Sequence, residues 1–321
     1  MSQATASVAQ GGDGSIQVSG LRHVYKKGVV ALDGVDLEIG TGLFGLLGPN
    51  GAGKSTLMKI LCTLIVPTEG QVTVNGFDAL AKPRDVRQSL GYLPQDFGAW
   101  RLQRVREALD SFAMMAGISS RAERKDRVTK ALEQVNLLKV ADRKVKKLSG
   151  GMRRRLGVAQ ALVHDPKIIV VDEPTVGLDP EERNRFSSLM AELALSRTIV
   201  LSTHIIADLG AACQNLAIID SGRIEFRGSP TELVQAASDK VFELIIEPGS
   251  DLSGEGYEVV AHTRDEEGRH KLRAVATTAS PPAGAVRAET PSLEEAYLAF
   301  MASRGRADAA VSGAGLEEER G

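Results

Sequence analysis

The fold is decided by the stretch Gly48-Pro49-Asn50-Gly51-Ala52-Gly53-Lys54-Ser55, which continues into Thr56. It matches the pattern G-x-x-x-x-G-K-[S/T] and lies between an apolar run at 43–47 and a segment of helical spacing at 57–64. Glycine is needed because the backbone N–H groups must wrap around a phosphate, at dihedral angles and distances that a side chain would block. Lys54 would reach the β- and γ-phosphates, and the Ser55 hydroxyl would bind Mg²⁺. A glycine turn that only starts a helix is the lesser alternative.

A second motif is the fully apolar run 168–171, which ends in Asp172 and Glu173. Ligands of open α/β sheets bind outside the carboxyl ends of the strands, where both motifs fall. Asp172 would therefore hold Mg²⁺, and Glu173 would polarise an attacking water. Further apolar runs at 198–202 and 216–219 alternate with helical segments, which predicts a parallel sheet flanked by helices.

Ser149, Gly150 and Gly151 precede a segment of helical spacing and are predicted to cap its N-terminus. Such a helix end is a second anion site in the same chain, although an ordinary Ser-Gly cap is the simpler interpretation of these residues alone. Arg153 to Arg155 follow the cap, and we interpret them as surface charge rather than as an arginine finger.

Composition excludes several classes of protein. The chain has 321 residues with a net charge of −2, so no overall basic field points to nucleic acid. Residues 121–155 do hold 13 Lys and Arg against 4 Asp and Glu, which we interpret as a solvated helical face. The two cysteines, Cys62 and Cys213, have no zinc-site spacing, and no apolar run approaches the length of a membrane span. The first residues lack the pattern of a secretory signal.

Taken together, the motifs resemble the ATP-binding subunits of ABC transporters. The resemblance covers roughly residues 16–233. It rests on residues in that family's order and spacing, namely Tyr25, Gly48 to Thr56, Gln95, Leu148 to Gly151, Asp172, Glu173, Gly177 to Asp179, and His204.

The resemblance implies a role for each remaining motif residue. Tyr25 would stack on adenine, Gln95 would touch Mg²⁺ and a transmembrane partner, and His204 would contact the γ-phosphate. Taken singly, these residues would be a half-buried tyrosine, a loop amide and an ordinary hydrogen-bonded histidine. Asp179 would lie at a dimer interface, and Ser149 to Gly151 would close on ATP held by the other subunit. Met152 departs from the family, which most often has glutamine there, and methionine cannot donate a hydrogen bond.

The expected fold is α/β. A P-loop NTPase core carries an N-terminal antiparallel β subdomain, a helical subdomain inserted before the signature motif, and a small C-terminal α+β appendage. The expected division is a disordered tail at 1–14, an ATP-binding domain at 15–235 with its helical subdomain at about 96–147, an accessory domain at 240–300 and a second tail at 301–321. In the accessory domain, we expect strands at 241–247, 257–263 and 271–275, and a final helix that opens at Pro291-Ser292.

The resemblance implies an ATPase that binds ATP and Mg²⁺ and dimerises head to tail, with itself or a related subunit. It would drive a separately encoded permease from the cytoplasmic face of the membrane. Residues 91–98 and 291–298 resemble those of ABC-2 type exporters, including daunorubicin-type drug-resistance exporters, so we expect export of a drug-like or lipophilic compound. The permease would select that compound.

The alternative is a soluble ABC ATPase that acts on DNA or the ribosome. A single cassette without a coiled-coil or zinc insertion and without overall basic charge disfavours it, and no nucleic-acid partner is expected. A nucleotide sensor without turnover is disfavoured because Glu173 and His204 are both present.

Overall fold

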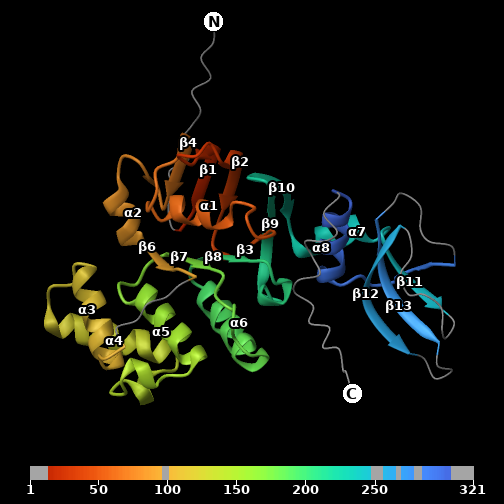
Figure 1. Cartoon of the computed structure of the whole chain (residues 1–321). Helices are drawn as coiled ribbons and strands as arrows, with labels where there is room; N and C mark the ends of the chain where they lie inside the picture. The colour runs from red at the N-terminus through yellow and green to blue at the C-terminus, as the bar shows by residue number, and fades with distance from the viewer. Residues whose placement is uncertain (1–13, 96–100, 247–255, 265–268, 278–283, 305–321) are drawn as a thin grey trace, which may run out of the picture. The chain divides into compact units, whose positions relative to one another are not determined.

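The computed structural model describes residues 14–95, 101–246, 256–264, 269–277 and 284–304 (Figure 1). The chain divides into two units. The first holds the residues up to His204 together with 208–227, and the second holds 205–207 and the residues from Gly228 onward.

A six-stranded sheet forms the centre of the first unit, in the order β10-β9-β3-β8-β7-β6. Its neighbouring strands β6, β7, β8, β3 and β9 are parallel, as predicted. Helix α1 packs on β7 and β8, and α6 packs on β3 and β8, so both faces are covered (Figure 1). The strands β3 and β7 are apolar up to Asp172, whereas the buried β8 also holds Thr198, Ser202 and Thr203. The elements are β3 (Gly42–Leu47), α1 (Lys54–Leu61), β6 (Leu90–Leu93), β7 (Ile168–Asp172), α6 (Pro180–Ala194), β8 (Thr198–Thr203), β9 (Cys213–Asp220) and β10 (Arg223–Gly228).

A second sheet of the first unit has the order β2-β1-β4-β5. Its strands are β1 (Ile16–Val24), β2 (Val30–Ile39), β4 (Glu69–Val74) and β5 (Phe77–Asp78), and each pairs antiparallel with its neighbour. The predicted antiparallel strands at 16–39 are present, whereas β4 and β5 were not predicted. Apolar side chains of this sheet, of α1 and of the central sheet share one hydrophobic core.

The helical part of the first unit lies between β6 and β7. It contains α3 (Val105–Met115), α4 (Arg121–Gln134), two short 3₁₀ turns at Leu138–Val140 and Val145–Lys147, and α5 (Gly150–Leu162); α2 (Pro83–Ser89) precedes β6. Ser120 caps α4 by accepting a hydrogen bond from the Glu123 amide. The five residues 96–100, which begin the predicted helical subdomain, lie outside the described residues.

The second unit has a four-stranded antiparallel sheet in the order β12-β13-β11-β14. Its elements are α7 (Pro230–Ala237), β11 (Val241–Ile246), β12 (Tyr257–Arg264), β13 (His270–Ala276), β14 (Val286–Arg287) and α8 (Leu293–Ala302). The three longer strands and the final helix occur where the sequence predicts them. Ser292 and Glu295 form a capping box at the start of α8, and α8 packs on α7 and β13.

The structure corrects three expected boundaries. Gly14 is buried and its amide donates to Asn75 Oδ1 (3.0 Å), so it belongs to the first unit rather than to a tail. Helix α7 falls within the expected ATP-binding domain, but it belongs to the second unit because it packs on α8. Met301 and Ala302 are buried at the end of α8, although we expected the C-terminal tail to start there. The other tail residues, 1–13 and 305–321, lie outside the described part of the chain.

None of the helices in the described residues is both long enough and apolar enough to cross a bilayer.

Candidate active site

The loop between β3 and α1 requires glycine at two close approaches. At Gly48 a Cβ would lie 2.2 Å from the carbonyl oxygen of Ile219, and at Gly53, where φ is +110°, it would lie 2.5 Å from that of Ala31. Gly51, with a φ of +80°, also has a left-handed backbone. Gly53 precedes α1, and no side chain in the described structure caps that helix. The first amides of α1 therefore stay available to an anionic group.

Lys54, the first residue of α1, is buried and lies back across the loop. Its Nζ donates to the carbonyl oxygens of Gly48 (2.6 Å) and Pro49 (3.1 Å), and it lies 3.1 Å from Glu173 Oε1. Both charged side chains are about one-twentieth exposed. A buried ion pair needs such additional hydrogen bonds to offset the loss of hydration. Lys54 thus links the loop directly to Glu173.

Two hydroxyl groups converge on the carboxylate of Asp172, which is 2% exposed. Ser55 Oγ donates to Asp172 Oδ1 over 3.3 Å, and Ser202 Oγ donates to the same oxygen over 2.5 Å. Ser202 was not predicted as a site residue. The signal that could have found it is the parallel register, in which Ser202 on β8 is the partner of Asp172 on β7.

These oxygens fit a magnesium ion. Mg²⁺ takes oxygen ligands, and commonly one or two from protein, with phosphate oxygens and water completing its shell. Ser55 and Asp172 offer a hydroxyl and a carboxylate beside the phosphate loop. The described residues contain no cluster of three or more His, Cys, Asp or Glu that could hold a metal ion.

Glu173 has an unusual backbone conformation, and residues of the neighbouring strand β8 and of the segment after it bind its amide and its carboxylate. Its φ is +47°, and such a conformation costs a non-glycine residue about 1–3 kcal/mol. Its amide donates to the carbonyl oxygen and to Oγ of Ser202, each over 3.1 Å. His204 Nδ1 donates to Glu173 Oε2 over 2.6 Å. Two of the three predicted catalytic residues, Glu173 and His204, are thus brought together, and Lys54 reaches the other oxygen of the same carboxylate. The third, Gln95, makes no hydrogen bond to them in the described residues, and its catalytic role stays a prediction.

A buried carboxylate that sequence reasoning missed, Asp208, lies behind this centre. It is 1% exposed and accepts hydrogen bonds from Thr203 Oγ1 (2.7 Å) and from Thr175 Oγ1. Burial raises the pKa of Asp208, although the two hydroxyl groups and the charge of Arg183 oppose the rise. Asp208 ties the segment after Glu173 to the segment that carries His204. No motif spacing could have identified it, because its partners come from three different elements.

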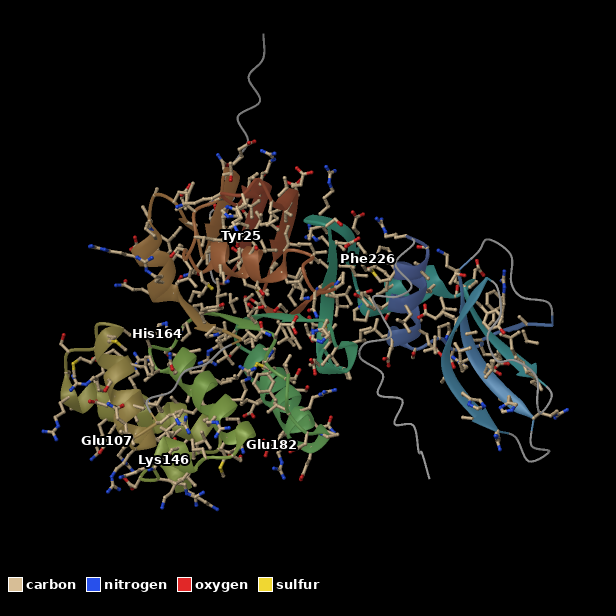
Figure 2. The ribbon with its side chains drawn as sticks, in the orientation of Figure 1. Tyr25, Glu107, Lys146, His164, Glu182 and Phe226 are labelled. Atoms are coloured by element: carbon tan, nitrogen blue, oxygen red, sulfur yellow. The ribbon has the colours of Figure 1, made fainter. Side chains whose placement is uncertain are left out.

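Tyr25 follows β1 and lies beside the first turn of α1 (labelled in Figure 2). Its hydroxyl is 3.1 Å from Thr56 Oγ1, and its ring meets His23 edge to face at 4.7 Å. The residue is 41% exposed. The structure therefore sets an accessible aromatic ring next to the phosphate loop, and adenine stacking on it stays a prediction.

The predicted signature residues sit at the N-terminus of α5. Ser149 is the N-cap and accepts a hydrogen bond from the Met152 amide (3.1 Å). Gly150 has no atom within 4 Å of its Cβ position, whereas a Cβ on Gly151 would lie 2.0 Å from Glu182 Oε2. Asp179 caps α6 in the same way, by accepting from the Glu182 amide (2.8 Å; Glu182 is labelled in Figure 2). Within the described residues, the segment 149–151 makes no hydrogen bond with the phosphate loop, and neither does Asp179.

The arginine run was predicted to be surface charge, and this is correct only for Arg153. Arg155 Nη1 donates to the carbonyl oxygen of Val135 (3.4 Å), and Arg154 Nη1 donates to that of Gln95 (2.9 Å). The prediction is wrong for these two because a helical period turns positions 154 and 155 to the same face as the buried Gly151 and Val158. Gln95 itself is the second residue after β6.

Comparison with known proteins shows which sequence family and which relatives this chain is similar to. The sequence family described as "ABC transporter" matches residues 32–176. The Nod factor export ATP-binding protein I of Cupriavidus metallidurans is 40% identical, over 69% of this chain and 73% of that protein. The doxorubicin resistance ATP-binding protein DrrA of Mycobacterium tuberculosis is 37% identical, over 75% and 73%.

Solved structures show the same architecture. The chain is similar to cbiO1 from Clostridium perfringens, part of the ABC transporter complex cbiONQ, with a TM-score of 0.64 and 28% identity, over 69% of this chain and 90% of that one. It is also similar to a bacterial ABC transporter cassette, MJ0796, solved as a dimer, with a TM-score of 0.60 and 28% identity, over 67% and 98%. The same cassette in a post-hydrolysis state bound to ADP and Pi is 27% identical to this chain.

Proposed function

Because this chain belongs to the ABC transporter family of ATP-binding proteins, we propose that its ATPase activity powers export of a compound through a separate membrane permease. The family, the ATPase activity and the α/β fold predicted from the motifs are confirmed by the relatives and solved cassettes described above. The chain is thus an ATP-binding ATPase with relatives in export and drug resistance. The roles of individual residues and the partners are our proposal.

The observation that carries the catalytic proposal is the position of Glu173 between Lys54 and His204. We assign phosphate binding to Lys54 and the loop 48–53. Water attacks the γ-phosphorus, its proton passes to the Glu173 carboxylate, and the bond from the γ-phosphorus to the bridging oxygen breaks so that ADP leaves. His204 orients Glu173. A Mg²⁺ ion held by Ser55 and Asp172 would neutralise phosphate charge. The family resemblance implies that Gln95 would also touch this ion.

We further propose that two copies, or this chain and a related subunit, enclose two ATP molecules. Support comes from the N-terminus of α5, where Gly150 is exposed and unobstructed. In the described part of one chain it makes no hydrogen bond with that chain's own phosphate loop. An exposed helix end of this kind suits an anionic group of a nucleotide bound to a second subunit. The likeness to a cassette solved as a dimer supports the same arrangement.

The permease would dock on the helical part of the first unit. Four large apolar side chains are exposed there, Leu102 (74%), Met114 (56%), Met115 (64%) and Leu138 (40%). Exposed large apolar side chains are candidates for contacts with a partner. Docking on a permease would place the chain on the cytoplasmic face of the membrane without a span of its own. Because the compared relatives are named for Nod factor export and doxorubicin resistance, we propose a drug-like or lipophilic cargo.

The test starts by identifying a membrane protein with about six apolar spans encoded beside this chain, and it uses that protein with the purified full chain. We expect the two to co-purify, and we expect ATP-dependent accumulation of doxorubicin in inverted vesicles that contain both. Glu173→Gln should abolish accumulation while the complex stays intact. ATPase activity that responds to DNA or ribosomes, with no permease association, would instead support the soluble alternative.

A further inference from the structure

Arg154 is an inward-facing arginine on α5, three residues after Gly151. Gly151 and Val158 on the same helix face are buried, Arg154 is half-buried, and its neighbour Arg153 is exposed. A guanidinium group so placed needs acceptors for its N–H groups. The structure supplies them from two loops of the candidate active site.

One loop is the segment after β7. Arg154 Nη2 donates to the carbonyl oxygen of Glu173 (3.1 Å), and Arg154 Nε donates to that of Pro174. The other loop is the segment after β6, which is the parallel neighbour of β7. There Arg154 Nη1 donates to the carbonyl oxygens of Gln95 (2.9 Å) and Pro94 (3.3 Å). One guanidinium group therefore binds four main-chain carbonyl groups in two loops.

This arrangement requires arginine. The guanidinium is a rigid, planar fork with five N–H donors, whereas a lysine ammonium is a single charge with three donors at one atom. All four acceptors are main-chain atoms, so the side chains of these loops stay available for other contacts.

The contact with Glu173 completes the support of its unusual backbone. Ser202 binds the amide of Glu173, and Arg154 binds its carbonyl group. The peptide groups on both sides of the Glu173 Cα are therefore fixed, which holds a φ of +47° and directs the carboxylate at Lys54 and His204. Without Arg154, the amide of Glu173 keeps its hydrogen bonds to Ser202, but the carbonyl group of Glu173 loses the hydrogen bond described here.

We propose that Arg154 is a positioning residue that holds Glu173 and the Gln95 segment in their working geometry and links both to α5. The proposal rests on the function above, in which Glu173 accepts the proton of water. Because Ser149 caps the start of α5, a movement of this helix end is transmitted by Arg154 to both loops. In this proposal Arg154 acts through Glu173, whose main-chain carbonyl group it binds.

The test compares Arg154→Lys, Arg154→Ala and the matched control Arg153→Ala in the full chain. A misplaced catalytic group costs about 10²-fold in rate, so we expect both Arg154 variants to lose about that factor in kcat. Nucleotide affinity, measured with a fluorescent ATP analogue, should stay within about threefold, because Lys54 and the glycine loop are intact. Arg153→Ala should keep kcat. Thermal unfolding shows which variants are folded. If Arg154→Ala does not fold, Arg154→Lys alone carries the test.

A double variant separates positioning from general structural support. In a Glu173→Gln background, Arg154→Lys should cause no further loss, because both residues act through the same carboxylate. Multiplicative losses would overturn the proposal, as would a kcat within threefold of wild type for both Arg154 variants. Equal losses of kcat and nucleotide affinity would also overturn it. Normal turnover by Glu173→Gln alone would instead refute the proposed role of Glu173.

Discussion

His204 Nδ1 lies 2.6 Å from Glu173 Oε2, although 31 residues separate the two in sequence. The parallel pairing of β7 with β8 causes this contact, because the two strands end at the same edge of the sheet and each is followed by one of these residues. Lys54 Nζ approaches the other carboxylate oxygen at 3.1 Å. The carboxylate of Glu173 is thereby held from two sides, which favours one orientation toward the phosphate loop.

Glu173→Gln should keep ATP binding and lose turnover. Removal of a general base typically lowers the rate by about 10²- to 10⁴-fold, whereas glutamine has nearly the same shape and leaves the loop 48–53 untouched. Dimers should accumulate with ATP, as gel filtration would show. The matched control is Glu181→Gln on α6, whose side chain is 76% exposed and pairs with Arg185. Steady-state hydrolysis by Glu173→Gln within a few-fold of the control would remove Glu173 from the proposed role.

Tyr25→Ala should raise the KM for ATP and leave kcat nearly unchanged. Stacking on adenine contributes equally to the ground state and the transition state, so its loss weakens binding without slowing chemistry. Tyr25→Phe is the control, because it removes only the hydroxyl that lies 3.1 Å from Thr56 Oγ1 and keeps the ring. An unchanged KM for the alanine variant, or a phenylalanine variant as weak as the alanine variant, would contradict ring stacking.

Arg273→Met should destabilise the second unit and leave ATP binding unchanged. Arg273 makes two hydrogen bonds to the Glu295 carboxylate, which is buried in α8, and one to Glu243 (2.8 Å). Removing one partner of a largely buried pair costs about 2–4 kcal/mol in the free energy of unfolding. Urea unfolding would measure it. A loss of nucleotide affinity in the folded variant would show that the second unit contributes to the nucleotide site.

The same pair predicts a pH dependence. Burial acts to raise the pKa of Glu295, but hydrogen bonds from Arg273 and Ser292 outweigh it and hold the pKa below its ordinary value of 4.5. Since the folded pKa is the lower one, this carboxylate stabilises the fold above about pH 4.5, and the contribution is lost as the pH falls further. Unfolding of the second unit should show this slope in wild type and a weaker slope in Arg273→Met. Equal slopes would contradict the assignment.

Both cysteines should resist alkylation in the folded protein. Cys62 and Cys213 are buried, and burial raises the pKa of Cys213 to about 11. At pH 8 the reactive thiolate form of Cys213 is then about one part in a thousand of its thiol. Maleimide labelling followed by mass spectrometry should find no rapid modification of the native chain and two labels after unfolding in guanidinium chloride. Rapid native labelling of either thiol would show that its surroundings open.

Several features were predictable because they depend on neighbouring residues alone. The loop 48–55 is recognisable because its glycines are required by local dihedral angles and close approaches, whatever the rest of the chain does. The buried strands β3 and β7 are continuous apolar runs up to Asp172, and the helix caps at Ser149, Asp179 and Ser292 bond within three residues. Strands β4 and β5 escaped prediction because β4 alternates only over its last four residues, 71–74, and β5 has only two residues.

The sequence by itself determined the local motifs and, through their order, the family. The tertiary structure alone decided which side chains meet. Ser202 reaches Asp172, Asp208 joins Thr175 to Thr203, and Arg154 binds the loops of Gln95 and Glu173, all across elements that are distant in the chain. The physical reason is the strand order β3-β8-β7-β6, which is not the order in sequence. Sequence spacing therefore cannot state which strand ends become neighbours, and only the parallel pairing of the folded sheet sets these contacts.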